Sequence, residues 1–209
     1  MPETTPILYS FRRCPYAMRA RMAISIANCN VRLREVVLRD KPEEMIAASP
    51  KATVPVLVDH AGVVDESLAV MRWALTQSDP ECWLASVNDA LIETNDGDFK
   101  HHLDRYKYST RYEDADRETH REAGARFLSA LDERLQPHAY LNGDQRSFVD
   151  IAIFPFIRQF RIADPAWFDA CSYDRVKQWL AGLMKSDLFI SVMTKYLSLI
   201  HISEPTRPY

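Results

Sequence analysis

The sequence lacks the features that define membrane, secreted and nucleic-acid-binding proteins. Within its 209 residues no stretch approaches the roughly 18 uninterrupted apolar residues of a membrane span. Residues 1–5 lack a charged segment leading into an apolar one, so we expect a cytoplasmic protein with no membrane partner. The formal net charge is only -3, with 26% charged residues of both signs, which gives no reason to expect a nucleic-acid partner. Small molecules are the partners that remain.

Paired cysteines are also missing. The four cysteines lie far apart, which suits neither a disulfide framework nor a zinc site with paired ligands. His101 and His102 are adjacent, so on a helix they point about 100° apart, and we expect that they cannot easily share a metal ion. The sequence therefore predicts no metal site.

The first part of the chain alternates between strand and helix patterns. Predicted strands cover residues 7–11, 31–38, 54–58 and 63–64, and predicted helices cover residues 15–27 and 42–48 and begin again at Ser67. Apolar periodicity then stops near residues 76–81, where an Asp-Pro pair disfavours helix continuation and predicts a linker.

Everything beyond this linker has helical periodicity. Ser147 and Asp150 form a capping-box pattern before an apolar run in which Pro155 is expected to kink the helix. Residues 173–184 and 188–196 predict two further amphipathic helices. Residues 201–209 contain two prolines and no periodicity, which predicts a disordered or non-native tail.

Cys14 is the candidate reactive group. It follows a predicted strand and precedes Pro15, a residue suited to the first position of a helix, where unpaired N–H groups and the helix dipole stabilise a thiolate. We expect Arg12, Arg13 and the arginines at 19 and 21 to add positive charge nearby and to lower the pKa of the thiol. The alternative is that Cys14 is a small core residue. Cys29, Cys82 and Cys171 lack such a setting.

Several motifs, in this order and spacing, resemble the glutathione S-transferase superfamily: Cys14–Arg19 (CPYAMR), Thr53–Leu57 (TVPVL), Asp65–Ser67 (DES) and the cap at Ser147–Asp150. The likeness spans roughly residues 6–196. The beginning is most similar to omega-type, cysteine-containing enzymes, and Phe99–Tyr108 resembles a bacterial omega-like group. This resemblance implies an α/β thioredoxin-like domain at residues 1–78 followed by an all-α domain at residues 83–200.

The resemblance also implies a glutathione site. Pro55 would follow a cis peptide bond, and the Val54 backbone would pair with the tripeptide. Glu66 and Ser67 would hold the γ-glutamyl ammonium and carboxylate, and Lys41 would lie near the glycine carboxylate. Read without the family, Val54 is a strand residue, Ser67 an N-cap, Glu66 a first-turn acid and Lys41 a surface lysine.

A cysteine in place of the tyrosine or serine of conjugating relatives implies a mixed disulfide with glutathione. Ala17 stands where a second redox cysteine would be, so the cycle uses one cysteine. The leading hypothesis is a dimeric glutathione-dependent thiol transferase or reductase that acts on a small electrophilic or disulfide substrate. The alternatives are a non-catalytic glutathione-binding regulatory protein and a glutathione-dependent isomerase or conjugating enzyme. Tyr106 and Tyr108 either line the co-substrate pocket or pack in the core or in a dimer interface.

Overall fold

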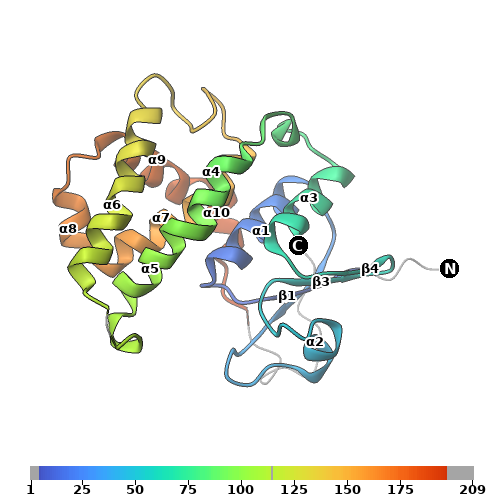
Figure 1. Ribbon diagram of the computed structural model, residues 1–209. Coiled ribbons are helices and arrows are strands. Elements are labelled where there is room, and N and C mark those ends of the chain that lie inside the picture. The colour runs from blue at the N-terminus through green and yellow to red at the C-terminus, as the bar shows by residue number, and fades with distance from the viewer. Residues whose placement is uncertain (1–4, 114, 197–209) are drawn as a thin grey trace. The chain divides into compact units, whose positions relative to one another are not determined.

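The computed structural model describes residues 5–113 and 115–196 (Figure 1). The tail predicted at residues 201–209 therefore lies outside the described residues. Contacts divide the chain into two compact units, one made of Met1–Pro80 together with the chain from Asp187 onward, and the other of Glu81–Ser186. The first unit is α/β and the second is helical, which confirms the predicted fold class.

The first unit is built on a sheet whose four strands, among the described residues, have the order β2-β1-β3-β4. The central strand β1 (Ile7–Ser10) runs parallel to β2 (Arg32–Glu35) and antiparallel to β3 (Val56–Asp59), which pairs in turn with β4 (Gly62–Val64). In the register, Leu8 lies opposite both Leu33 and Leu57, and all three are fully buried. This apolar row anchors the sheet.

Helices cover both faces of this sheet. Helices α1 (Pro15–Ile26) and α3 (Ser67–Gln77) pack on each other on one face, and α2 (Glu43–Ala48) lies on the other, against β3 (Figure 1). Helix α1 starts with Pro15 at its first position and ends before Asn28, whose φ of 52° is left-handed and cannot continue the helix. The arrangement is thioredoxin-like.

Strand β3 begins later than predicted. The sequence analysis placed Val54 and Pro55 inside this strand, whereas the ladder starts at Val56. The difference follows from the chemistry of proline, which has no N–H to donate to a neighbouring strand and so stands at the strand entrance.

The first unit is completed from the far end of the chain. Helix α10 (Asp187–Val192) packs against α1, and the guanidinium of Arg12 donates a hydrogen bond of 3.4 Å to the carbonyl of Met193 (Figure 1). Leu188, Phe189 and Val192 of α10 are buried. The chain therefore leaves this unit after Pro80 and returns to it at Asp187.

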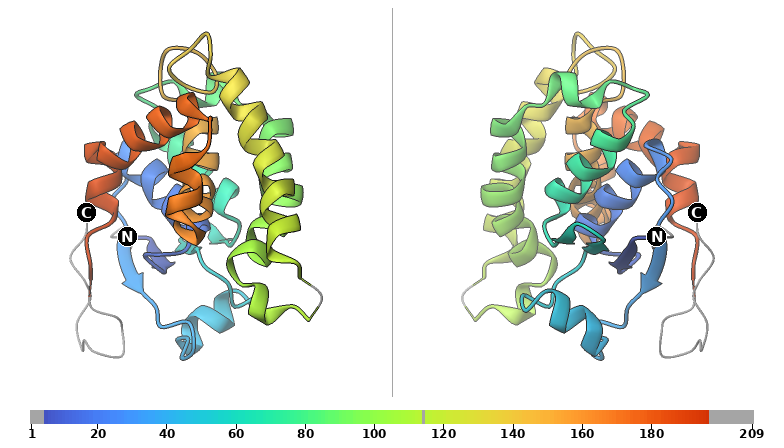
Figure 2. Two further views of the ribbon diagram at one scale, coloured as in Figure 1. Left: turned by 90° about the vertical axis from the view of Figure 1, so that its left-hand side faces the viewer. Right: turned by 90° about the vertical axis from the view of Figure 1, so that its right-hand side faces the viewer.

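The second unit consists of helices. Its elements are the 3₁₀ turn Trp83–Ser86, α4 (Asp89–Thr94), the π-helical turn Asn95–Phe99, α5 (Lys100–Lys107), the 3₁₀ turn Ser109–Arg111, α6 (Arg117–Arg134), α7 (Phe148–Ala163), α8 (Pro165–Ala170) and α9 (Asp174–Lys185). Helices α5 and α6 lie side by side, as Figure 2 shows in green and yellow. The π-helical turn joins α4 to α5 without a break in the helical backbone.

Helix α7 is the buried centre of this unit, and its start confirms the predicted capping box at Ser147 and Asp150. The fully buried Asp150 carboxylate accepts hydrogen bonds from the Ser147 amide at 2.9 Å, the Leu141 amide at 2.9 Å and the Trp179 indole at 2.8 Å. Burial raises the pKa of Asp150, and these hydrogen bonds oppose that rise. The helix continues through Pro155 to Ala163.

The Phe160 ring of α7 lies against a glycine of α6. A Cβ atom at Gly124 of α6 would lie 2.5 Å from Cε2 of Phe160 in α7, a distance that no packed pair can adopt. Phe160 also stacks near Phe99 and Tyr106, with ring centroids 5.5 Å and 4.8 Å away. Gly124 is the residue that lets the Phe160 ring reach these partners.

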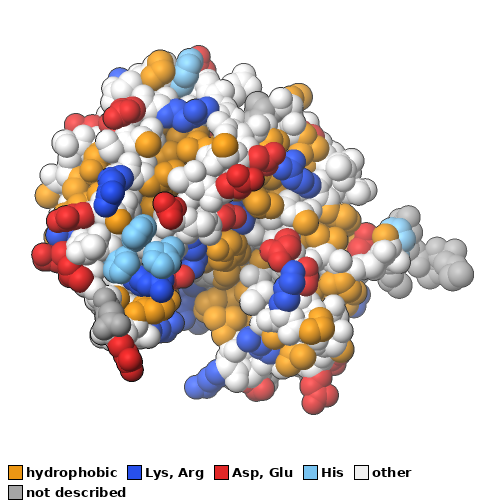
Figure 3. Space-filling model, in the orientation of Figure 1, with side chains coloured by type: hydrophobic (Ala, Val, Ile, Leu, Met, Phe, Trp, Pro, Cys, Tyr) orange, Lys and Arg blue, Asp and Glu red, His pale blue; other side chains and the backbone are white. Residues whose placement is uncertain are grey.

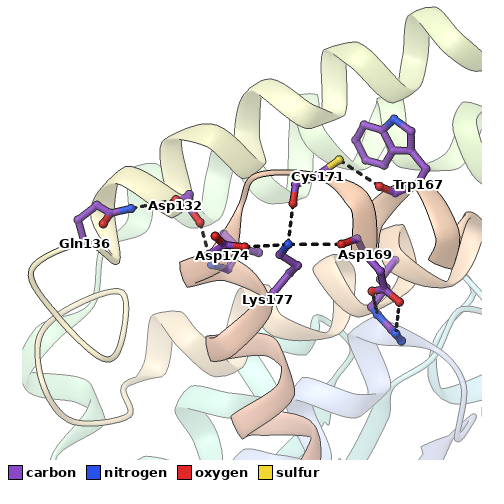
Figure 4. Close-up of polar contacts among 9 residues, drawn as sticks. Asp132, Gln136, Trp167, Asp169, Cys171, Asp174 and Lys177 are labelled. Carbon is purple, nitrogen blue, oxygen red and sulfur yellow. Dashed lines mark hydrogen bonds and ion pairs between the residues drawn. The ribbon is translucent and has the colours of Figure 1, made fainter.

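The turn between α8 and α9 is held by polar contacts (Figure 4). The Lys177 ammonium donates to the carbonyl of Cys171 at 2.6 Å and pairs with the Asp174 carboxylate at 2.8 Å. The amide of Val176 donates to Asp132 of α6 at 3.0 Å, which ties the start of α9 to that helix.

No helix within residues 5–113 and 115–196 is both long and apolar enough to cross a membrane.

Candidate functional site

Cys14 occupies the N-cap of α1 and is half-buried. Its amide donates to the Phe11 carbonyl at 3.0 Å, and its own carbonyl accepts the first helical hydrogen bond, from Met18, at 2.9 Å. Its sulfur lies 3.7 Å from the carbonyl oxygen of Val54. The thiol thus stands, half-buried, at the positive end of a 12-residue helix.

Two of the four arginines near Cys14 in the sequence are buried and make hydrogen bonds within the first unit. Arg19 is buried and donates to Ser67, while Arg21 is buried and donates to Ser10 at 3.3 Å and to the Arg12 carbonyl at 2.9 Å. Helix α1 is buried on nearly all sides between Pro15 and Ile24, so both arginines lie within the first unit.

Glu35 is the partner that holds the Arg12 segment in place. Its carboxylate accepts a hydrogen bond from the Arg12 amide at 2.8 Å and lies 3.8 Å from Arg21. Burial raises the pKa of Glu35, and the Arg12 amide and the nearby guanidinium groups oppose that rise. These contacts fix the loop that leads into Cys14.

The peptide bond between Val54 and Pro55 is cis, as the resemblance implied. Val54 is 8% exposed and packs in one cluster with Cys14, Tyr9 and Ala17. In the described part of the chain, the Val54 amide donates no hydrogen bond, because the ladder of β3 starts two residues later. A backbone donor next to the thiol is thus available to a ligand.

Ser67 is the first residue of α3, so the reading of Ser67 as an N-cap is wrong: the N-cap position belongs to Glu66. The Ser67 hydroxyl oxygen accepts hydrogen bonds from Nε and Nη2 of Arg19 at 3.0 Å and 2.9 Å. Because both acceptor positions of the oxygen are used, the hydroxyl can offer its hydrogen to an anion. The sequence analysis placed Arg19 near Cys14 and did not foresee its hydrogen bonds to Ser67.

Lys51 is a second residue that the sequence analysis missed. Its ammonium lies 2.6 Å from Glu66 and 3.3 Å from Asp65, and the Asp65 carboxylate also accepts from the Ser49 hydroxyl at 2.8 Å. The hydrogen bond from Ser49, followed by that from Lys51, lowers the pKa of Asp65. The pKa of Lys51 is raised, first by its hydrogen bond to Glu66 and then by its hydrogen bond to Asp65. The only sequence signal was a lysine three residues before Val54.

Lys41 stands apart from these residues. It is half-buried and lies between the bridge Val37–Asp40 and α2. Within the described chain it makes no hydrogen bond or ion pair with the other predicted site residues. The structure therefore forms two groups of predicted site residues: Cys14 lies beside Val54 and Pro55, and Ser67 lies beside Glu66 with Lys51. Arg19 of α1, the helix that Cys14 caps, links the two groups through its hydrogen bonds to Ser67. Lys41 belongs to neither group.

Two of the other cysteines are structural. The Cys29 sulfur lies 3.6 Å from the Ala74 carbonyl, and the Cys171 sulfur lies 3.2 Å from the Trp167 carbonyl (Figure 4). Burial raises the pKa of both thiols, which disfavours the thiolate. Cys82 is exposed.

Tyr106 belongs to the core of the helical unit. It is 1% exposed, its ring lies 4.8 Å from that of Phe160, and the Arg117 guanidinium lies 4.9 Å above it. Of the two readings of this tyrosine, core packing is therefore the one that the structure supports. Tyr108 is half-buried, with the guanidinium of Arg111 4.2 Å above its ring.

The expectation that His101 and His102 cannot share an ion is wrong. One ligand atom of each, together with one of His120, lies within 4.8 Å of the others. Adjacent residues do point apart on one helix, but the ring centroids of His101 and His102 lie only 5.1 Å apart, and His120 of α6 lies close to both. A pattern on one helix could not reveal a partner on the next.

Two family descriptions match this chain. Residues 8–81 match the N-terminal domain of glutathione S-transferases, and residues 109–182 match their C-terminal domain. The chain belongs to the glutathione S-transferase superfamily.

Individual relatives support this membership. A probable glutathione transferase of Aplysia californica is 33% identical over 91 residues, which cover 44% of this chain and 97% of the relative. Glutathione S-transferase omega-1 of Mus musculus is 25% identical over 201 residues, which cover 92% of this chain and 78% of the relative. Among solved structures, a glutathione transferase family member from Pseudomonas fluorescens with two glutathione bound has a TM-score of 0.78 at 18% identity, covering 90% of this chain and 92% of that one.

Proposed function

We propose that this chain is a glutathione-dependent thiol transferase or reductase of the omega-like, cysteine-containing bacterial group, in which Cys14 forms a mixed disulfide with glutathione. The observation that carries this proposal is the half-buried Cys14 thiol at the N-cap of α1, 3.7 Å from the Val54 carbonyl. A thiolate in this position is an accessible nucleophile.

The groups around Cys14 complement the charges and the backbone of glutathione. The N-terminus of α3 and the Ser67 hydroxyl suit the γ-glutamyl carboxylate, and Glu66, which Lys51 holds at 2.6 Å, suits the ammonium group. The amide of Val54 can pair with the backbone of the central cysteine, with Pro55 fixing the entrance to β3. Lys41 would approach the glycine carboxylate. The relative from Pseudomonas fluorescens holds two glutathione molecules on the same fold.

The reaction follows from thiol–disulfide exchange. The Cys14 thiolate attacks the glutathione sulfur of a mixed disulfide, a Cys14–glutathione disulfide forms, and the substrate leaves as a thiolate that takes a proton from water. A second glutathione thiolate attacks this disulfide, so that oxidised glutathione leaves and Cys14 is again a thiolate. Ala17 offers no competing thiol, so the cycle needs the external glutathione. We place this activity in the cytoplasm, in a homodimer.

The test is the intact mass of the protein after incubation with oxidised glutathione. The parent is expected to gain one glutathione, Cys14→Ala none, and reduced glutathione should remove the adduct. Cys82→Ala is the matched control because Cys82 is also exposed to reagents, and it should behave as the parent does.

Two outcomes would contradict the proposal. An adduct that persists in Cys14→Ala and disappears in Cys82→Ala would show nonspecific thiol exchange. A parent that binds glutathione by calorimetry without forming an adduct would support a non-catalytic binding protein, or an isomerase or conjugating enzyme, instead.

A further inference from the structure

Three histidines meet where α5 and α6 pack on each other. His101 and His102 come from the first turn of α5, and His120 comes from the first turn of α6. The Nδ1 atoms of His102 and His120 lie 2.8 Å apart, and the ring centroids of His101 are 5.1 Å and 5.9 Å from those of the other two. Figure 3 shows histidine side chains gathered on the surface where Figure 1 draws these helices.

We propose that His101, His102 and His120 form a binding site for one divalent late transition-metal ion, of which Zn²⁺ is the representative. Their ligand atoms already lie within 4.8 Å of one another, on two packed helices. Two imidazole nitrogens on a tetrahedral zinc ion stand about 3.4 Å apart, given Zn–N distances of about 2.1 Å. The 2.8 Å pair therefore has to open slightly and the third ring has to close in by up to about 1.4 Å to accept the ion.

The imidazole ligand set decides the class of ion. Three imidazoles suit Zn²⁺, Ni²⁺, Co²⁺ and Cu²⁺, whereas Mg²⁺ and Ca²⁺ require oxygen ligands. Three protein ligands leave a fourth tetrahedral position for water. This site would therefore hold an ion that stays open to a small ligand.

The charges around the three histidines are mixed. Asp98 and Asp116 lie near these rings and favour a cation, while Arg105 and Arg126 oppose one. Without a metal, His102 and His120 share one hydrogen bond, which an ion would replace.

The histidine cluster is open to solvent, and His101 is its third proposed ligand. His101 is exposed, and His102 lines a cavity of about 290 Å³ together with Asp98 and Arg126. The Arg105 guanidinium lies 3.0 Å from Nδ1 of His101, so Nε2 is the nitrogen that can bind an ion without displacing Arg105. An ion can thus enter from solvent.

The π-helical turn Asn95–Phe99 directly precedes α5 and changes its phase relative to α4. Such turns insert one residue into a helix and rotate everything that follows. Here the rotation sets the face on which His101 and His102 stand, next to α6. The site depends on this turn as well as on the three histidines.

The experiment is a calorimetric titration of the untagged, chelator-treated full chain with ZnCl₂ in buffer without glutathione. The parent is expected to bind one Zn²⁺ per chain. His102→Gln and His120→Gln should each weaken binding by at least about tenfold, because each removes a ligand. His138→Gln, which changes a half-exposed histidine paired with Asp144, is the matched control and should bind as the parent does.

Melting temperatures distinguish a variant that has lost the metal site from a variant that folds poorly. Zn²⁺ should raise the melting temperature of the parent and of His138→Gln, and leave that of His102→Gln unchanged, since an ion stabilises only a fold that binds it. The absorption spectrum of the Co²⁺-loaded protein should lack the strong near-ultraviolet band of cobalt–thiolate bonds. The presence of that band would show that the ion binds at cysteines. Parent-like affinity in both histidine variants, or no binding by the parent, would overturn the proposal.

Arg105→Gln tests the third ligand. Removing a positive charge next to His101 should tighten Zn²⁺ binding several-fold, as expected for like charges at short range. Nonspecific binding would not respond in this direction. An unchanged or weaker affinity would remove His101 from the site.

Discussion

The hydroxyl of Ser67 serves two neighbours. It accepts two hydrogen bonds from the buried guanidinium of Arg19, and in the proposed function its hydrogen is donated to a ligand at the start of α3. This double role separates Ser67 from an ordinary helix-capping residue, whose loss would affect stability alone.

Ser67→Ala should therefore lower both stability and glutathione affinity. The free energy of unfolding should fall by about 1–3 kcal/mol because Arg19 loses two hydrogen bonds, and glutathione binding should weaken by about tenfold. Chemical denaturation and calorimetry measure the two effects. Ser78→Ala, at the exposed C-terminal end of the same helix, is the control and should change neither. Unchanged glutathione affinity in Ser67→Ala would remove Ser67 from the ligand site.

Asp65 makes the stability of the fold depend on pH. Its pKa is lowered in the folded protein, first by Ser49 and then by Lys51, so the ionised form stabilises the fold. This contribution is fully present above the unfolded pKa of about 3.9 and is lost as the pH falls through the lower folded value. The side chain is partly exposed, which limits the effect to about 0.5–1 kcal/mol.

Asp65→Asn should accordingly be less stable than the parent at pH 7, and the difference should shrink at a pH of about 3. Urea unfolding at the two pH values measures it, with the exposed Asp144→Asn as a reference substitution. A difference that grows on acidification would contradict the assigned direction.

At this scale the sequence predicted Cys14 at the start of a helix and a helix starting at Ser67, and the family resemblance predicted the cis peptide bond at Pro55. It did not predict Arg19 beneath Ser67 or Lys51 beside Glu66, because both contacts join residues far apart in the chain, 48 and 15 positions. Local patterns carry no information on which surface of a helix a distant side chain will meet.

At the scale of elements, the contact of the Phe160 ring of α7 with α6 depends on one missing side chain. Gly124→Ala should cost about 1–3 kcal/mol because the new methyl group would overlap the Phe160 ring. Gly182 lies in the exposed interior of α9 with nothing within 4 Å of a Cβ atom. Gly182→Ala should therefore stabilise the protein by about 0.5–1 kcal/mol.

Thermal or chemical unfolding of both variants measures this contrast. The pair is informative because the same substitution is made twice in helices, with opposite expected signs. A stabilising Gly124→Ala would mean that Phe160 can move aside at no cost, and that the contact of its ring with α6 does not depend on the glycine.

Helices and strands were predicted well where the pattern was long or its ends were marked. The start of α7 at its capping box and the start of α1 at Pro15 agree with the sequence analysis. The segment after Trp83 was predicted as a regular helix but contains a 3₁₀ turn, a short helix and a π-helical turn. In 3₁₀ and π-helical turns the backbone hydrogen bond spans one residue fewer or one residue more than in an α-helix. Side-chain periodicity over a few residues is too coarse to detect this difference.

At the scale of the whole molecule, the family resemblance predicts a homodimer. Light scattering at micromolar concentration should give twice the chain mass of 24.1 kDa, and dilution should show whether the mass falls together with the glutathione-dependent activity. A mass of one chain at these concentrations would rule out the dimer.

The discontinuity of the first unit has a consequence for protein synthesis. Glu81–Ser186 is continuous in the chain, so all of its residues are synthesised before α10. The unit that carries Cys14 is complete only when α10, the last described helix, has been made and packs on α1. The part of the protein made first is thus the last to be finished, and a chain that stops before Asp187 would leave the apolar surface beneath α10 exposed.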